Sequence, residues 1–469
     1  FQKMILLLLS LLLLVLFQSF NLFLLFGGIA AAIYFYYYYQ SKYWERRGIP
    51  SPRGTRLFYG DAPDVFDPLN PFIRQMHEWT KELGPIYGFK LGTHNCLVVS
   101  EPNMVREVMV DQFDNFYERT KDPISGDSDK EKRITLFRSK GARWKRLRAI
   151  SSPSFSTNSL RKICPVLEEC ATRMVELLVE RHGDGSCFNI HEFFMEYTMD
   201  SISRLVMNEK QSTQFATYRV EAVRKVFDRD QRRFIVYAAF AIPGVGRLLR
   251  ELHKRVQDPA LRLVQEMEQA VAERVKQRSS GEYNVDAPED YIDLFLDATA
   301  DFDTLAHSTG AWSHTNEFAK KLTVDEVVMQ CVVFMVAGFE TTSGALAYAA
   351  WVLVEYPEVQ QKVYDEITKY CSHPSADFAD LSQLKYTEAM LKETLRHYPL
   401  GGLAASRTCA NNTTLSGVPV EKDTLVFCDA YAVHFDKTLW GEDADEFKPE
   451  RWLDPSRRPP PTAYLSFGG

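Results

Sequence analysis

The chain has 469 residues, of which 45% are hydrophobic, 13% aromatic and 25% charged, which excludes a disordered or collagen-like protein. This length suits one large domain or two ordinary ones. The 55 Lys and Arg against 62 Asp and Glu give a net charge of −7, which argues against nucleic acid as the main partner, because phosphate binding needs clustered basic residues. The eight cysteines form no CxxC pair, so the sequence indicates neither a disulfide framework nor a zinc site.

Residues 1–41 have the character of a membrane anchor. No charged side chain occurs in residues 4–41, which are dominated by Leu, Val, Ile, Phe, Ala and Tyr. Because roughly 20 apolar residues cross a bilayer core, the stretch predicts one transmembrane helix over residues 21–39. An interfacial extension of that helix and a hairpin remain alternatives. A cleaved signal peptide is a further alternative, which the length of the apolar stretch disfavours.

The residues that follow the apolar stretch predict the orientation of the anchor. A belt of tyrosines at positions 34 and 36–39 precedes three basic residues, Lys42, Arg46 and Arg47. Since Lys and Arg gather on the cytoplasmic side of membrane helices, the rest of the chain is expected in the cytosol. Residues 42–54 are basic and proline-rich, and they predict a stiff hinge between the membrane and the globule.

Residues 55–469 predict a single domain that is mainly α with a small β lobe. Helical periodicity predominates, and short strand-like runs occur at residues 86–91, 96–99 and 424–428. No internal repeat is present in the sequence.

A basic run surrounds Trp144 in the next informative segment. Five basic residues lie within nine positions: Lys140, Arg143, Lys145, Arg146 and Arg148. A solvated basic helix face is the usual explanation of such a run. The functional interpretation is that Trp144 and Arg148, four residues apart and so on one side of a helix, reach an anionic cofactor, while the other charges face an acidic partner.

A long apolar helix is predicted to begin at a capping box formed by Thr323 and Glu326 and to end before Pro357. Its residues 327–354 are apolar nearly all round, as in a helix buried in a large protein or in a membrane. The polar residues at its centre, including Glu340, would make a second membrane span costly. We therefore expect the central helix of the globular core.

The centre of this helix carries a motif with two interpretations. Gly338, Glu340 and Thr341 are poor choices for helix packing, because glycine weakens a helix and a buried carboxylate needs partners. They suit a flat, bulky group lying against the small side chains, with a proton route beside it. Alternatively, Thr341 bonds back to a helix carbonyl and Glu340 pairs with a distant arginine. The residues alone do not decide between these two.

Two further segments carry paired charges. Glu393 and Arg396 lie three residues apart on a predicted helix over residues 386–397, and Arg451 follows in a Pro-Glu-Arg-Trp run. If the segments meet, the three residues form a buried Glu-Arg-Arg cluster. The last residues, from Phe467 to Gly469, have the pattern of a tight glycine turn.

Taken together and in this order, these segments resemble the cytochrome P-450 superfamily of haem-thiolate monooxygenases, within it the membrane-anchored animal group that includes the drug-metabolising enzymes. The resemblance covers nearly everything after the anchor. It is carried by residues 144–148, 337–342, 393–396, 447–452 and 467–469. It implies that family's fold, preceded by the N-terminal transmembrane helix.

The resemblance implies that the cofactor is haem b. Trp144 and Arg148 would bind the haem propionates, joined by Arg407 and Arg119. Arg407 lies eight positions after Pro399, one more than the family spacing leads us to expect. Phe467 would begin the haem-binding loop.

Further roles follow from the resemblance for the long helix and the paired charges. Ala337 and Gly338 would leave room for the porphyrin and dioxygen, while Glu340 and Thr341 would deliver protons. The Glu-Arg-Arg cluster would support the haem-binding loop. The basic run around Trp144 would dock an NADPH-dependent flavoprotein reductase, with cytochrome b5 as a candidate second electron donor.

The family's iron-ligating cysteine is expected five residues beyond Gly469, so no residue of this chain is assigned as a metal ligand. None of the eight cysteines lies in the corresponding sequence context. A thiolate ligand favours O–O cleavage, so the chemistry is expected only of a chain that carries it.

The sequence thus predicts a fragment of a monooxygenase of the endoplasmic reticulum membrane that oxidises an apolar small molecule. A peroxide isomerase or dehydratase on the same fold is one alternative, and a non-catalytic, membrane-tethered binding protein is another. Substrate identity is not readable from the residues.

Overall fold

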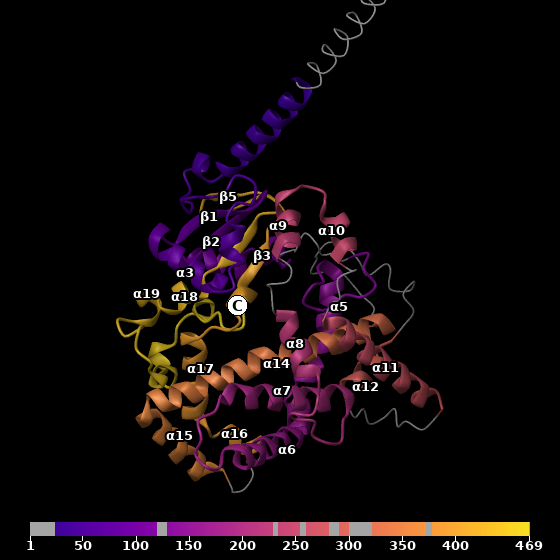
Figure 1. The fold of residues 1–469 in the computed structure, drawn as a ribbon. Helices are drawn as coiled ribbons and strands as arrows, with labels where there is room; N and C mark the ends of the chain where they lie inside the picture. The colour runs from indigo at the N-terminus through magenta and orange to yellow at the C-terminus, as the bar shows by residue number, and fades with distance from the viewer. Residues whose placement is uncertain are drawn as a thin grey trace, which may run out of the picture.

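The computed structural model describes residues 24–119, 129–227, 233–253, 259–280, 290–299, 321–371 and 378–468. A helix over residues 24–41 projects away from the globule (Figure 1). The described helices of the globule are α2 Ala62–Val65, α3 Phe72–Leu83, α4 Pro102–Arg106, α5 Gly141–Ser151, α6 Thr157–His182, α7 Ile190–Met207, α8 Arg219–Phe227, α9 Arg233–Ala241, α10 Gly246–His253, α11 Pro259–Ser279, α12 Tyr291–Leu296, α14 Val324–Glu355, α15 Pro357–Tyr370, α16 Phe378–Leu381, α17 Lys385–His397, α18 Ala430–His434 and α19 Lys437–Trp440.

The β lobe is small and stands apart from most of the helices (Figure 1). Strands β1 Ile86–Leu91 and β2 His94–Val99 pair antiparallel, β2 pairs parallel with β6 Leu425–Cys428, and β6 pairs antiparallel with β3 Ser406–Thr408. The remaining strands, β4 Thr413–Leu415 and β5 Val418–Val420, form a separate hairpin. The mainly helical architecture with a minor sheet, and the three predicted strands, are confirmed.

The long helix α14 runs through the largest apolar cluster of the described residues. Val327, Cys331 and Phe339 on α14 pack in one core with residues of α5, α7, α11 and α12. Among the described helices, only α14 is long and apolar enough to cross a membrane, and 44% of its most apolar stretch is buried. Its place in the core confirms the prediction of a central globular helix.

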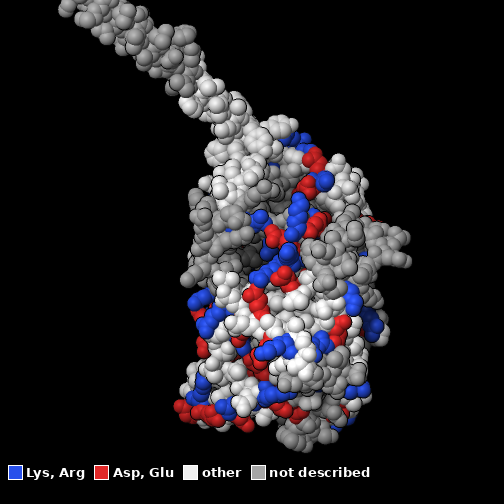
Figure 2. All heavy atoms as spheres, turned by 90° about the vertical axis from the view of Figure 1, so that its right-hand side faces the viewer, with Lys and Arg blue, Asp and Glu red and all other residues white. Residues whose placement is uncertain are grey.

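The predicted membrane anchor lies only partly within the described residues. Residues 1–23 fall outside them, whereas the helix over residues 24–41 exposes large apolar side chains such as Phe26, Ile29 and Phe35. Its surface carries no charged side chain where it leaves the globule (Figure 2). A single membrane span at this end of the chain stays a prediction.

Specific contacts join this helix to the globule. The Tyr37 hydroxyl donates to the carbonyl oxygen of Ala241, the last residue of α9, at 2.6 Å. Trp44 is 2% exposed, and its indole Nε1 donates to the Phe89 carbonyl oxygen at 3.0 Å. Gly88 on β1 creates the slot for this ring, because a Cβ there would lie within the indole. The helix is therefore attached to the globule by packed side chains as well as by the chain itself.

We predict that Gly88→Ala destabilises the globule by about 1–3 kcal/mol, because the added methyl forces the Trp44 ring out of its slot. Urea unfolding followed by circular dichroism measures the change. Gly28→Ala is the matched control, since nothing lies within 4 Å of a Cβ at that position. Equal stability of both variants and the parent protein would show that the indole is not held there.

Candidate functional site

The helix α14 begins as the sequence predicted. The Thr323 hydroxyl accepts from the backbone N–H of Glu326 at 3.1 Å, and the Glu326 carboxylate accepts from the backbone N–H of Thr323 at 3.0 Å. This reciprocal capping box satisfies two donors that would otherwise have no partner at the helix start. The helix then continues to Glu355, two residues before Pro357.

The capping glutamate also pairs with two arginines of α5. Glu326 accepts from Arg146 Nη2 at 2.8 Å and from Arg143 Nε at 2.9 Å, and all three residues are at most 2% exposed. Burial opposes ionisation of Glu326, but hydrogen bonding and charge from Arg146, with the charge of Arg143, keep the pKa of this carboxyl below its usual range. The cluster ties α5 to the start of α14.

This pairing corrects the prediction that the charges around Trp144, apart from Arg148, face an acidic partner protein. Arg143 and Arg146 pair with the buried Glu326 carboxylate, so they are not available at the surface. Lys140 pairs with Asp129 at 3.3 Å. Arg148, in contrast, is exposed on α5, one turn after the half-buried Trp144.

Small and hydroxylic side chains interrupt the buried surface of α14 at its centre. Ala337 and Thr341 are exposed, although Phe339 between them is fully buried. The Thr341 hydroxyl donates to the Ala337 carbonyl oxygen at 2.7 Å, which is the back-bond that the sequence left open as an alternative. Thus one strip of the core helix faces open space rather than packed neighbours.

The two other residues of the motif, Glu340 and Gly338, have different surroundings. Glu340 Oε2 is buried and has no hydrogen-bond partner among the described residues, so the predicted pairing with a distant arginine is not found there. A Cβ at Gly338 would lie 3.3 Å from the Ile202 side chain on α7. The glycine therefore permits close packing of α7 against α14, and its proposed role in making room for a porphyrin stays a prediction.

Three arginines from distant parts of the chain, Arg119, Arg148 and Arg407, lie near one another. Arg119 Nη1 and Arg407 Nη1 both donate to the Ala404 carbonyl oxygen, at 2.5 and 2.8 Å. Burial, followed by the charges of Arg407 and Arg148, lowers the pKa of Arg119 to about 10. Burial likewise lowers the pKa of Arg407. In the part of the chain that the structure describes, none of the three forms an ion pair.

This group of guanidiniums has no carboxylate partner among the described residues. Desolvated like charges destabilise one another, and arginine forks bind carboxylates in a bidentate geometry. The donor set therefore fits a ligand that carries carboxylate groups. The exposed Ala337 and Thr341 on α14 fit a flat group beside those carboxylates, so the residues present fit a haem.

The end of the described chain lies close to these arginines. Arg407 Nη2 donates to the Gly468 carbonyl oxygen at 3.3 Å. Gly468 has φ 89°, and a Cβ there would lie 3.1 Å from the Ala404 carbonyl oxygen, so the turn requires glycine. Phe467 is 78% exposed, and the chain end is drawn close to β3 and α17 (Figure 1).

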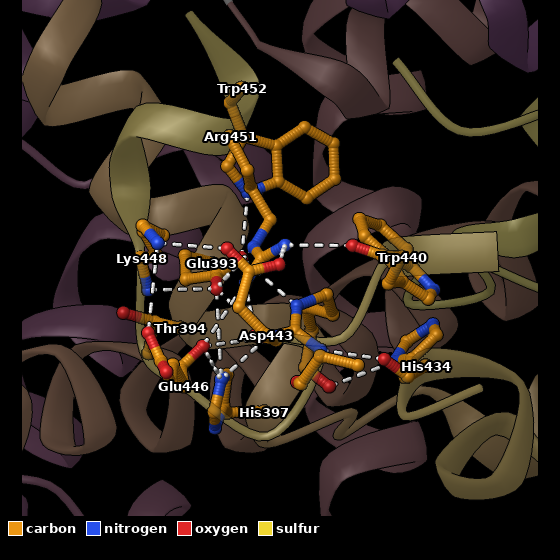
Figure 3. Close-up of polar contacts among 12 residues, drawn as sticks. Glu393, Thr394, His397, His434, Trp440, Asp443, Glu446, Lys448, Arg451 and Trp452 are labelled. Carbon is orange, nitrogen blue, oxygen red and sulfur yellow. Dashed lines mark hydrogen bonds and ion pairs between the residues drawn. The ribbon is translucent and has the colours of Figure 1, made fainter. Parts of the chain in front are cut away.

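The predicted Glu-Arg-Arg cluster is confirmed and is buried (Figure 3). Glu393 is fully buried and accepts from Arg396 Nε and Nη2, at 3.0 and 2.8 Å, in a bidentate pair. Arg451 Nε donates to the same carboxylate at 2.9 Å, as does the Trp452 indole, also at 2.9 Å. The sequence reasoning did not anticipate Trp452 as a donor.

The charge balance of this cluster favours the ionised carboxylate. Burial raises the pKa of Glu393, but hydrogen bonds from His397 and Arg396 and the charges of Arg396 and Arg451 outweigh it, so that the pKa falls to about 2. Arg396 also donates to the carbonyl oxygens of His434 and Ala444, at 2.6 and 2.8 Å. The cluster therefore fastens α17 to the segments that follow α18.

The comparisons with known proteins agree with this arrangement. The sequence model of the cytochrome P-450 family matches residues 50–469. Two Caenorhabditis elegans proteins that carry cytochrome P-450 names are similar to the chain. The one named CYP13A10 is 41% identical over 91% of this chain and 84% of its own length, and CYP13A1 is 39% identical over 92% and 84%.

We predict that Glu393→Gln costs about 3–5 kcal/mol in the free energy of unfolding, because it removes the carboxylate that pairs with the buried Arg396 guanidinium and the nearer of the two that pair with Arg451. The folded-state pKa of Glu393 lies below 4.5, so its contribution is complete above about pH 4.5 and is lost as the pH falls towards 2. The stability difference between the parent and the variant should shrink over that range in urea unfolding.

The matched control for this prediction is Glu388→Gln on the same helix. Glu388 is exposed and pairs with Lys392 at 2.7 Å, so its loss should cost less than about 1 kcal/mol. Equal losses from the two variants would contradict the structural role assigned to Glu393.

Proposed function

The chain belongs to the cytochrome P-450 family, and we propose that it inserts one atom of O2 into an apolar small molecule with NADPH electrons relayed by a flavoprotein reductase. As a family member it is a haem-dependent monooxygenase, an oxidoreductase. The observation that carries the proposal is the group of Arg119, Arg148 and Arg407, which has no acidic partner among the described residues. The finer points of substrate, partners and location are proposals.

The residues that would hold the haem, which we take to be haem b, are those of the arginine group. Arg119, Arg148 and Arg407 would bind the propionates, and Trp144 on α5 would add an indole donor. Phe467 would begin the haem-binding loop. When bound, the haem supplies the binding and reductive activation of O2, and the protein supplies orientation and protons.

Two side chains of α14 are suited to handling protons. The Thr341 hydroxyl is both donor and acceptor, and it is exposed beside Ala337. The Glu340 carboxylate follows directly along the chain, and its Oε2 has no partner among the described residues. A proton held at Glu340 can pass through water to the Thr341 hydroxyl, which can rotate away from its helix carbonyl.

Two apolar side chains support an apolar substrate. Ala337 presents only a methyl group, and the exposed Phe137 ring covers the Arg119 guanidinium with a distance of 4.7 Å from the guanidinium carbon to the ring centroid. An aromatic ring over a guanidinium shields a neighbouring apolar ligand from the charge.

We also propose that residues 1–41 anchor the protein by a single span in the endoplasmic reticulum membrane, with residues 55–469 in the cytosol. The exposed apolar surface of the helix over residues 24–41 supports this, as does the basic hinge over residues 42–54. Lys42 pairs with Glu45 at 2.6 Å at the base of the helix. The reductase and cytochrome b5 would meet the protein at the same membrane.

We predict that the full-length protein, reduced under carbon monoxide, shows the red-shifted Soret band of a thiolate-bound haem. Arg407→Gln should weaken haem binding by roughly 10- to 100-fold, since it removes a charge-assisted hydrogen bond to a propionate. Haem titration followed by absorbance measures the affinity. Arg53→Gln, at an exposed arginine of the hinge, is the control and should bind haem normally. A colourless protein that takes up no haem contradicts the proposal.

We further predict that Thr341→Ala uncouples electron use from product formation, because the hydroxyl that handles the proton is lost. The ratio of product formed to NADPH consumed measures coupling. Thr341→Ser keeps the hydroxyl and should retain most of the coupling. Unchanged coupling in the alanine variant would remove the proton role of Thr341.

A further inference from the structure

A buried histidine joins α17 to the end of the described chain. His434, the last residue of α18, is fully buried. Its Nδ1 lies 2.8 Å from the carbonyl oxygen of Arg396, and its Nε2 lies 2.8 Å from the backbone nitrogen of Leu465. A carbonyl oxygen can only accept and a backbone N–H can only donate. The geometry therefore fixes the proton on Nδ1 and leaves Nε2 as an acceptor.

The histidine is held from the side of the Glu393 cluster. Arg396 Nη1 donates to the His434 carbonyl oxygen at 2.6 Å, so backbone and side chain of these two residues bond in both directions (Figure 3). Burial lowers the pKa of His434 to about 4, which keeps the ring neutral at physiological pH. Nε2 therefore remains a hydrogen-bond acceptor at physiological pH.

Residues 464–468, which we call the terminal loop, are positioned by this ring. Tyr464 stacks on His434 with 5.7 Å between ring centroids, and the Leu465 N–H donates to His434 Nε2. The Ser466 hydroxyl donates to the Leu395 carbonyl oxygen at 2.9 Å, which also leads back to α17. On its far side, the terminal loop meets Arg407 through Gly468.

We propose that His434 is a positioning residue that sets the terminal loop against α17, and through it the place of the axial ligand loop relative to the propionate arginines. This rests on the proposed function, in which Phe467 begins the haem-binding loop. His434 touches neither haem nor substrate in this proposal. Its ring donates to the Arg396 carbonyl oxygen and accepts from the Leu465 N–H, so it links the Glu393 cluster to the terminal loop.

If His434 only filled volume in the core, the effect of a substitution would depend on the size of the new side chain and not on the hydrogen bonds that it makes. In His434→Gln, the side-chain carbonyl can reach the position of Nε2 and accept from the Leu465 N–H. In His434→Asn, the side-chain amide can replace only the Nδ1 donor to the Arg396 carbonyl, so the Leu465 N–H is buried without a partner. The two variants thus separate the loop bond from the packing.

The experiment compares both variants with the parent in the full-length, haem-loaded protein. Amide hydrogen exchange at Leu465 should accelerate by at least about tenfold in His434→Asn and stay close to the parent in His434→Gln, because only the first leaves that N–H unpaired. The Soret band of the reduced carbon monoxide complex should lose its red-shifted form in the asparagine variant and keep it in the glutamine variant. Equal exchange rates and equal spectra in the two variants would overturn the proposal.

The parent protein offers a test that needs no substitution. In protein labelled with ¹⁵N-histidine, the nitrogen shifts of His434 should report a neutral ring protonated on Nδ1, and protonation on Nε2 would overturn the proposal. If the parent binds no haem, the proposed function fails. The contrast in Leu465 exchange between the two variants would still decide whether His434 holds the loop.

Discussion

The most demanding interaction in this structure is the burial of the Glu393 carboxylate. A fully buried negative charge is tolerated only when opposite charges and hydrogen-bond donors surround it, and removing one partner leaves an uncompensated charge in the core. Arg396 comes from the same helix, whereas Arg451 and Trp452 come from a segment more than 50 residues later. Their meeting holds residues 434–452 against α17, and His434 joins that region to the terminal loop.

Charge balance separates the structural arginines from those of the candidate site. Arg143 and Arg146 share the Glu326 carboxylate, as Arg396 and Arg451 share Glu393, so each of these arginines has a carboxylate partner and the pairs hold elements together. The group of Arg119, Arg148 and Arg407 has no such carboxylate among the described residues. Arg119 and Arg407 are largely desolvated, and like charges held together in this way favour the binding of an anion, which is why the group marks a candidate binding site.

The helix α14 has both a structural role in the core and a role in the candidate site. Its first turn is fixed by Thr323 and Glu326, and its centre packs through Gly338 against α7. On either side of Gly338, Ala337 and Thr341 are exposed, so a helix that belongs to the core also has a strip of small side chains at its surface. A rigid, buried helix is a suitable support for such a strip, because its side chains cannot shift without disturbing the core.

The sequence by itself determined the features that depend on neighbours along the chain. The capping box at Thr323, the end of α14 before Pro357, and the Glu393–Arg396 pair all follow from spacings of three or four residues, since local hydrogen bonds set helix ends and helix faces. The strands at 86–91 and 425–428 were likewise indicated by short apolar runs. The order of the motifs was enough to indicate the family.

Only the tertiary structure decided which charges meet. The run around Trp144 contains five similar basic residues, and nothing local distinguishes Arg146, which is buried on Glu326, from Arg148, which is exposed towards Arg119. The shared bond of Arg119 and Arg407 to one carbonyl oxygen, and the bond from Leu465 to His434, join residues that are remote in sequence. Such pairings depend on how the chain packs as a whole, because a charge or a buried donor is satisfied by whatever partner the fold brings within about 3 Å.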